Sequence, residues 1–172
     1  FCYRRFTIFD EAGQAIIQMM ATFVLMDRDS RKVRAVDPEI VAPYQSEFSK
    51  KLLRGPKYPD LENPVSKDYH VRFYDLDMNG HVNNSKYLDW IFEVMGADFL
   101  TQHIPKKVHL KYVKEVRPGG MIASSYDLEG LQSNHQISSD GEVNAQALVT
   151  WQEFKQENEE EQTWLIKDIW LI

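Results

Sequence analysis

Residues 67–102 read KDYHVRFYDLDMNGHVNNSKYLDWIFEVMGADFLTQ, and the rest of the chain is organised around this segment. Tyr69, Val71 and Phe73 alternate with polar or charged residues, which predicts a half-buried strand. A polar loop over residues 75–83 follows. Apolar side chains then recur at helical spacing, which predicts one long helix over residues 84–102, mostly wrapped by protein. This stripe consists of Tyr87, Leu88, Ile91, Phe92, Met95, Phe99 and Leu100.

The residues after this helix predict a run of strands. Alternation and apolar content indicate strands over residues 108–112, 121–128, 134–138 and 143–154, with glycine-containing turns at residues 118–120 and 139–141. The last segment, residues 164–172, is dense in Trp, Ile and Leu, and we expect it to add a final strand. A strand, a long helix and then several strands predict an α+β fold, with an antiparallel sheet packed on one helix.

The opening of the chain reads as a hairpin without a partner layer. Residues 2–9 alternate, residues 10–13 form a turn, and residues 15–26 are a strongly apolar strand. A lone hairpin is at best marginally stable in water, so these strands need further structure. Asp37 and Pro38 predict the start of a short helix. Residues 44–66 carry Pro and Gly with no sustained period and read as a linker.

Composition limits the classes of function. The 172 residues contain 20 Lys and Arg against 26 Asp and Glu, a net charge of −6, which argues against nucleic acid as a partner. The apolar run at residues 15–26 is shorter than the roughly 20 residues of a transmembrane helix, so we expect no membrane span. Cys2 is the only cysteine, which excludes an internal disulfide and fits a reducing compartment such as the cytoplasm. The histidines show no metal-ligand spacing, so neither a metal nor a cofactor is expected.

The loop before the helix concentrates the chemistry. It is held between a buried strand and a buried helix, a common position for a functional site. Asn83 or Asn84 would cap the helix, and the free N–H groups of a helix start favour a developing negative charge. Asn79 and His81 would add side-chain donors suited to an oxyanion. Asx-rich loops also serve as plain caps and turns, so polarity alone leaves a structural role open.

Residues 77–87 follow the pattern D-x-N-x-H-V-N-N-x-x-Y, which resembles the active-site segment of the acyl-acyl carrier protein (acyl-ACP) thioesterases, the plant FatA and FatB type and their bacterial relatives. Residues 3–8, 23–27 and 31–33 resemble the late part of that family's first domain, and residues 111–116 resemble its strand after the helix. The similarity covers residues 1–153.

The resemblance implies a fold of two tandem hotdog domains, each a curved antiparallel sheet wrapped around one long helix. Residues 1–43 would then be the second half of a first hotdog that is incomplete in this chain. Residues 44–66 would be the linker, and residues 67–172 the complete second hotdog with the catalytic motif.

The resemblance also assigns catalytic residues. The Asp, Asn and His of the motif fall on Asp77, Asn79 and His81, and a catalytic Glu in the strand after the helix falls on Glu115. Plant members carry Cys directly after that Glu, where this chain has Val116, so a cysteine acyl-enzyme is disfavoured. Attack by an activated water is the expected mechanism.

Two questions about this mechanism stay open at the level of sequence. Either Glu115 or Asp77 would act as the base, with His81 oriented between them, because burial or a neighbour can raise the pKa of either carboxylate. The substrate carbonyl would be polarised by Asn79 together with the backbone N–H of Val82 or of Asn83.

The implied reaction is hydrolysis of long- or medium-chain fatty acyl-ACP to free fatty acid and ACP. The expected partner is therefore acyl carrier protein, which is acidic. The net charge of −6 opposes long-range attraction, but a basic stretch at residues 50–57 or 106–117 could dock the carrier locally, with a plain solvated surface as the alternative for each stretch. A homodimer is a further assembly left open. A hotdog thioesterase acting on acyl-CoA and a non-catalytic acyl-binding module are the two competing functions.

Overall fold

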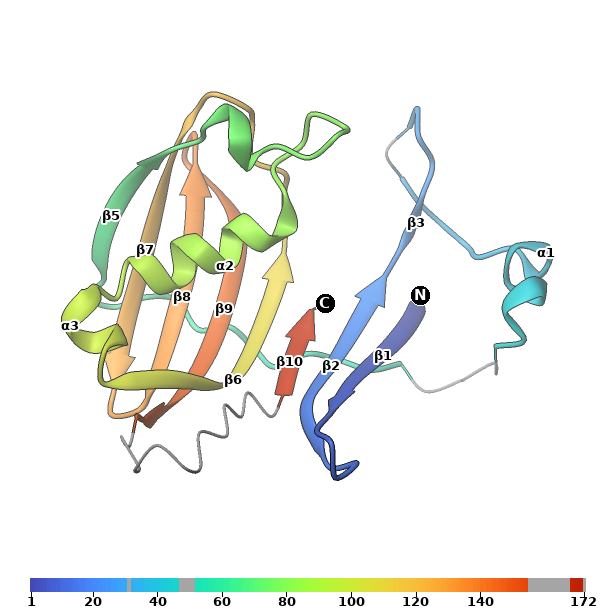
Figure 1. Cartoon of the computed structure of the whole chain (residues 1–172). Helices are drawn as coiled ribbons and strands as arrows, with labels where there is room; N and C mark the ends of the chain where they lie inside the picture. Colours follow the sequence, from blue (N-terminus) through green and yellow to red (C-terminus); the bar gives the residue numbers. More distant parts are fainter. Residues whose placement is uncertain (31, 47–51, 155–167, 172) are drawn as a thin grey trace.

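The structure is a computed structural model that describes every residue except 31, 47–51, 155–167 and 172. Its larger part is an antiparallel sheet of five strands, β6 (His103–Tyr112), β9 (Glu142–Glu153), β8 (Gln132–Ser139), β7 (Met121–Glu129) and β5 (Val65–His70), in that spatial order. Helix α2 (Asn84–Glu93), followed by α3 (Ala97–Leu100), lies across one face of this sheet (Figure 1). The predicted α+β arrangement of a hotdog fold is confirmed.

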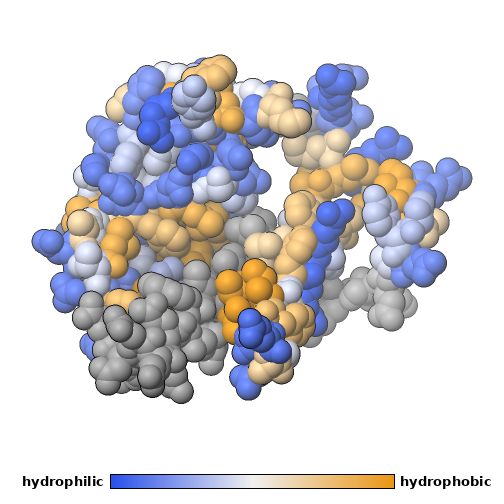
Figure 2. Space-filling model, viewed as in Figure 1, coloured by the Kyte–Doolittle hydropathy of each residue, from blue (hydrophilic) through white to orange (hydrophobic). Residues whose placement is uncertain are grey.

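The core lies between α2 and the sheet. The helix buries Tyr87, Trp90 and Ile91 and turns polar residues outward, so its outer side is blue in Figure 2. Trp151 is 1% exposed, and its ring lies 5.7 Å from that of Phe92, centroid to centroid. The buried apolar residues that the strands contribute to this core are Val108, Leu110, Ile122, Ile137, Ala145, Ala147, Val149 and Trp151.

The prediction of one helix over residues 84–102 is wrong in its extent. Helix α2 ends at Glu93, and α3 begins only at Ala97. Between them Gly96 has φ +84°, a conformation outside the helical region that residues with a side chain rarely adopt. The apolar stripe therefore continues across a bend rather than along a single axis.

The strand before the loop is also shorter than predicted. It ends at His70, and Phe73 lies in the 3₁₀ helix η2 (Phe73–Asp75) with 80% of its surface exposed. The Asp75 carboxylate accepts a hydrogen bond from the Arg72 N–H at 2.8 Å, which turns the chain out of the sheet. At the other end, β5 starts at Val65, so the last two residues of the predicted linker belong to the strand.

The beginning of the chain forms the predicted hairpin, β1 (Cys2–Phe9) with β2 (Ala15–Phe23). Beyond Val24 the apolar run continues as β3 (Leu25–Met26), which pairs with β4 (Val33–Arg34). The expected helix start at Asp37 is confirmed, because the Asp37 side chain caps α1 (Pro38–Val41), which leads into η1 (Ala42–Tyr44).

The last strand connects the two parts. The strand β10 (Asp168–Leu171), within the segment predicted to end in a strand, runs parallel to both β2 and β6 and completes an eight-stranded sheet (Figure 1). The linker also ties the parts together, because the Leu53 N–H donates to the Tyr3 hydroxyl and the Glu62 N–H to the Asp127 carboxylate. In the described part of the chain, every helix is too short or too polar to cross a membrane.

Candidate active site

The loop between η2 and α2 is a tight, hydrogen-bonded hairpin. Leu76 and Val82 face each other as an antiparallel bridge, flanked by hydrogen bonds from the Asp77 N–H to the His81 carbonyl (2.7 Å) and from the Asn83 N–H to the Asp75 carbonyl (2.8 Å). The sequence folds this way because Gly80 supplies the positive φ (+75°) that the turn requires. His81 is thereby held at the loop end nearest the helix.

The Asp77 carboxylate is used to hold this loop. Its Oδ1 atom accepts from the N–H of Asn79 at 2.8 Å and from the N–H of His81 at 3.1 Å, and Oδ2 lies 3.5 Å from the Asn79 amide nitrogen. The hydrogen bond from His81, followed by those from Asn79, lowers the pKa of Asp77 below its usual value. Asp77 therefore stays ionised near neutral pH and binds a proton weakly.

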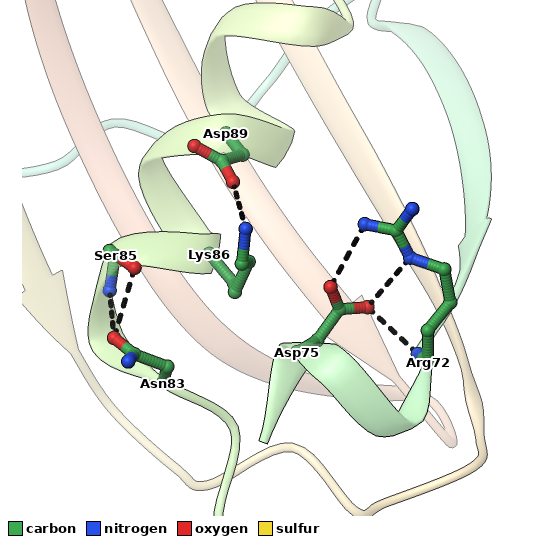
Figure 3. A network of polar contacts seen from close by, with 6 residues as sticks. All are labelled: Arg72, Asp75, Asn83, Ser85, Lys86 and Asp89. Atoms are coloured by element: carbon green, nitrogen blue, oxygen red, sulfur yellow. Dashed lines mark hydrogen bonds and ion pairs between the residues drawn. The ribbon is translucent and has the colours of Figure 1, made fainter. Parts of the chain in front are cut away.

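An ion pair between the exposed Arg72 and the buried Asp75 lies next to the loop (Figure 3). Asp75 is 1% exposed and accepts from the Arg72 guanidinium at 3.0 and 3.2 Å. Burial alone would raise the pKa of Asp75, but hydrogen bonds and the charge of Arg72 outweigh it and leave that pKa lowered. The fixed position of Asp75 matters because its carbonyl receives the Asn83 N–H.

Asn83 is the cap of α2, as one of the two predicted alternatives had it. Its side-chain oxygen accepts from the Ser85 N–H at 3.0 Å and from the Ser85 hydroxyl at 2.9 Å (Figure 3). Because the Asn83 N–H is bonded to the Asp75 carbonyl, it is not available to a substrate oxygen, contrary to expectation. The Val82 N–H has no hydrogen-bond partner among the described residues, and it is the better oxyanion donor of the two.

Glu115 is brought next to His81, although 34 positions separate them. Glu115 Oε1 lies 3.9 Å from His81 Nδ1, and the side chains are 57% and 50% exposed, so water reaches both. The expectation that Glu115 lies in a strand is wrong, because β6 ends at Tyr112. The N–H groups of Val113 and Lys114 both donate to the carbonyl of Asn144, which turns the chain away from the regular ladder.

Three residues that hold this geometry were missed in the sequence. The Tyr87 hydroxyl accepts from the Val116 N–H at 3.2 Å, and the Tyr112 hydroxyl donates to the Asn84 carbonyl at 3.0 Å. Asn144 is 2% exposed and contacts the Glu115 loop. The sequence carries no signal for Asn144, because it alternates with Val143 and Ala145 as the polar Gln146 does, and only a β-bulge in the pairing of β9 with β8 takes it out of that register. Tyr87 is the last residue of the motif over residues 77–87, whereas Tyr112 resembles an ordinary core residue.

The arrangement suits general acid–base chemistry on a substrate that enters from solvent. An imidazole and a carboxylate lie side by side, with a free backbone N–H close by in sequence at Val82. Among the described residues, no group of three or more His, Cys, Asp or Glu side chains is arranged to hold a metal ion. Cys2 lies in β1.

Comparison with known families and relatives agrees with the motif. The model of the acyl-ACP thioesterase C-terminal domain matches residues 58–153, and that of the N-terminal domain matches residues 1–44. Oleoyl-acyl carrier protein thioesterase 2 of Arabidopsis thaliana is 27% identical over 129 residues, and palmitoyl-acyl carrier protein thioesterase of Gossypium hirsutum is 26% identical over 150. These matches cover 65% and 81% of this chain but only 34% and 35% of the relatives, so the chain spans about a third of their length.

Solved structures share the fold. A protein described as an oleoyl thioesterase from Lactobacillus plantarum is 33% identical, with a TM-score of 0.76 over 90% of this chain and 64% of its own. The 12:0-ACP thioesterase of Umbellularia californica is 18% identical, with a TM-score of 0.70 over 88% of this chain and 62% of its own, and this likeness concerns the fold alone.

Proposed function

This chain belongs to the acyl-ACP thioesterase family, and from that premise we propose that it hydrolyses the thioester of a long- or medium-chain fatty acyl group carried by acyl carrier protein. The observation that carries the proposal is the contact between His81 and Glu115, 3.9 Å apart, with the N–H of Val82 following His81 directly in sequence. Hydrolysis needs an activated water and stabilisation of a tetrahedral oxyanion. This site holds groups for both tasks.

In the proposed reaction, water attacks the thioester carbonyl while the His81–Glu115 pair accepts its proton. The carbonyl oxygen becomes an oxyanion and is stabilised by the Val82 N–H and by the Asn79 amide. Collapse of this intermediate expels the thiolate of the carrier, which takes up a proton, and leaves a free fatty acid. Glu115 is the carboxylate of this pair, because the lowered pKa of Asp77 makes it a poor base. Asp77 instead holds the loop.

The tandem arrangement is part of the proposal. Residues 1–43 are taken as the second half of a first hotdog, residues 44–66 as the linker and residues 67–172 as the second hotdog. The N-terminal domain model ends at residue 44, which supports the first boundary, whereas the C-terminal domain model begins at residue 58 and β5 at Val65, both before the predicted start at residue 67. The acyl tail would then lie against the first of the two domains, next to residues of β2 and β3.

Charge supports a docking region for an acidic carrier. The two predicted basic stretches are adjacent in space. Lys111, in the second stretch, has its Nζ atom 5.9 Å from the centre of the Tyr58 ring, and Tyr58 directly follows Lys57 of the first stretch. No ion pair involves Arg54, Lys57 or Lys111 in the described part of the chain, so these charges are open to a partner. Lys50 and Lys51 lie outside the described residues. If this region docks the carrier, kcat/KM falls steeply with added salt.

The decisive experiment is hydrolysis of the same acyl group on ACP and on CoA, with wild type and with separate His81→Ala and Glu115→Gln variants. We expect each variant to lose roughly 10²-fold or more in kcat/KM, the size of a lost acid–base group. His70→Ala and Glu129→Gln, which change exposed residues of the same types elsewhere, serve as controls. Near-normal rates in both site variants would refute the mechanism, and a preference for acyl-CoA would reassign the substrate.

Asp77→Asn separates the two candidate bases. Asparagine keeps the side-chain oxygen that accepts from Asn79 and His81, so the loop is retained and we expect a loss of less than about tenfold. If Asp77 were the base, Asp77→Asn would be as inactive as Glu115→Gln.

A further inference from the structure

We propose that Asn144 is a positioning residue that holds Glu115 within reach of His81; this inference rests on the proposed function. Asn144 belongs to β9 and is 2% exposed, and it is the extra residue of a β-bulge, because Ser138 pairs with Val143 and Ile137 with Ala145. A buried amide is costly unless its donors and acceptors are satisfied, so its presence there calls for a specific partner. That partner is the backbone that carries Glu115.

The contacts of Asn144 surround this loop. Its backbone carbonyl accepts the N–H groups of Val113 at 2.8 Å and Lys114 at 3.1 Å. Its side-chain nitrogen lies 3.3 Å from the carbonyl oxygen of Glu115 and 3.4 Å from that of Lys114. One residue therefore contacts both the donors and the acceptors of the loop backbone.

The amide orientation is defined by a further contact. The Ser139 hydroxyl donates to Asn144 Oδ1 at 2.8 Å, which leaves the nitrogen, the donor end, toward the carbonyls of Lys114 and Glu115. Aspartate has the same shape but lacks the donor, and it would present a carboxylate to two carbonyl oxygens. An amide is thus the side chain that the site requires.

The opposite end of the loop is held from α2, which follows directly on the loop that carries His81. Val116 N–H donates to the Tyr87 hydroxyl at 3.2 Å, so Glu115 is fixed between Asn144 on the sheet and Tyr87 on the helix. The His81–Glu115 distance is therefore set by the packing of β9 against α2. A displacement of about 1 Å can cost roughly 10²-fold in rate, so a residue that contacts no substrate can control turnover.

The first test compares Asn144→Ala with Ser139→Ala and a matched control. We expect Asn144→Ala to lower kcat by about tenfold or more with KM changed by less than about twofold, because docking is untouched and only the acid–base pair moves. Ser139→Ala, which removes only the orienting hydroxyl, gives a smaller loss of the same kind and remains informative if Asn144→Ala does not fold.

The control is Ser133→Ala. Ser133 is equally buried and hydrogen-bonded, to Trp151 and His135, but it contacts neither loop of the site. Ser133→Ala is expected to lower stability while kcat stays within about twofold of wild type. Equal losses of kcat in Ser133→Ala and Asn144→Ala would mean that Asn144 acts only through stability, and would overturn the proposal.

A double-mutant cycle gives the sharper result. If Asn144 acts by positioning the Glu115 carboxylate, Asn144→Ala has little further effect in a Glu115→Gln background, so the two losses do not multiply. A general structural role would lower kcat by the same factor in both backgrounds, and that outcome would also overturn the proposal.

A readout without turnover separates this inference from the proposed function. The NMR chemical shift of the His81 ring is compared between wild type and Glu115→Gln, and again with Asn144→Ala present in both. We expect Glu115→Gln to shift the ring signal clearly in the first pair and much less in the second. A wild type that is inactive on every acyl thioester but shows this pattern would refute the proposed function alone. Equal shifts in the two pairs would refute the role of Asn144 alone.

Discussion

The hairpin that opens the chain and the five-stranded part around α2 both carry many apolar residues, but they bury them to different extents. Of the described residues before position 47, only Ala21 is buried, while Phe6 and Phe23 are 44% and 47% exposed. In the five-stranded part, Leu110 and Ile137 are completely buried. Apolar, orange surface accordingly runs along the hairpin and β3 in Figure 2.

The difference arises from what lies above each part of the sheet. Helix α2 covers one face of β5–β9, so most side chains on that face are buried or partly buried (Figure 1). The inward residues of the hairpin lie on the same eight-stranded sheet, but no helix covers them in the described structure. Burial, rather than apolar composition, therefore decides which of the two parts contributes most to stability.

The largest expected effect comes from truncating one aromatic residue in each part. Trp151→Ala removes a ring that packs on Phe92 and Phe99 and donates to Ser133, and should cost about 3–5 kcal/mol of unfolding free energy. Phe6→Ala changes a ring that is 44% exposed and should cost less than about 1 kcal/mol. Urea unfolding of the 172-residue chain measures both. Similar costs would show that the hairpin face is covered in solution.

A second, smaller effect is a pH dependence confined to the five-stranded part. His135 is 3% exposed, and burial lowers its pKa from the usual 6.5 to about 3. Between these values the unfolded chain binds a proton that the folded one does not, so stability falls as pH decreases through this window. The slope approaches roughly 1.4 kcal/mol per pH unit.

This slope is measured by urea unfolding between about pH 5.5 and 6.5, where carboxylates with ordinary pKa values near about 4 are already ionised. His135→Gln should remove it. The hairpin contains no histidine, so local amide exchange there should not follow the same titration. A slope that is unchanged in His135→Gln would assign the pH dependence to other groups.

The smallest effect concerns two glycines with the same backbone requirement, one in each part. Gly96, between α2 and α3, has φ +84°, and Gly13, in the hairpin turn, has φ +78°. Nothing lies within 4 Å of a Cβ at either position, so alanine introduces backbone strain of about 1–2 kcal/mol and no clash. Gly96→Ala should lower the unfolding free energy of the whole chain.

Gly13→Ala should instead speed amide exchange in β1 and β2, with a smaller effect on global unfolding. Gly120→Ala is the control, because Gly120 has no positive φ and its Cβ would lie 3.5 Å from the Arg117 carbonyl, an ordinary contact. Equal global effects of Gly96→Ala and Gly13→Ala would mean that the two parts unfold as one unit.

Much of the fold was predictable because it depends on local pattern. The alternation in β5 to β9, the stripe of α2 and the cap at Asn83 are each encoded within a few neighbouring residues. The prediction failed at two local features that the apolar pattern does not show. The positive φ of Gly96 ends the helix, and the hydrogen bond from the Arg72 N–H to the Asp75 carboxylate ends the strand early. Such local breaks leave the periodicity on either side intact, so periodicity does not reveal them.

The candidate site was predictable in its residues but not in its geometry. Spacing and family resemblance pointed to Asp77, Asn79, His81 and Glu115. They could not tell that Asp77 accepts backbone N–H groups and has a lowered pKa, or that the Asn83 N–H is already bonded. Both facts depend on how the loop closes on itself.

From its order of residues alone, this chain specifies an antiparallel sheet with one covering helix and a rigid polar loop at the start of that helix, because periodicity, caps and turns act over a few positions. The approach of Glu115 to His81 is different, since it requires β6, β9 and α2 to pack together. Only the tertiary structure brings Asn144 and Tyr87 to opposite ends of the Glu115 loop. Contacts between distant segments form when a shared core is buried, and no local pattern records them.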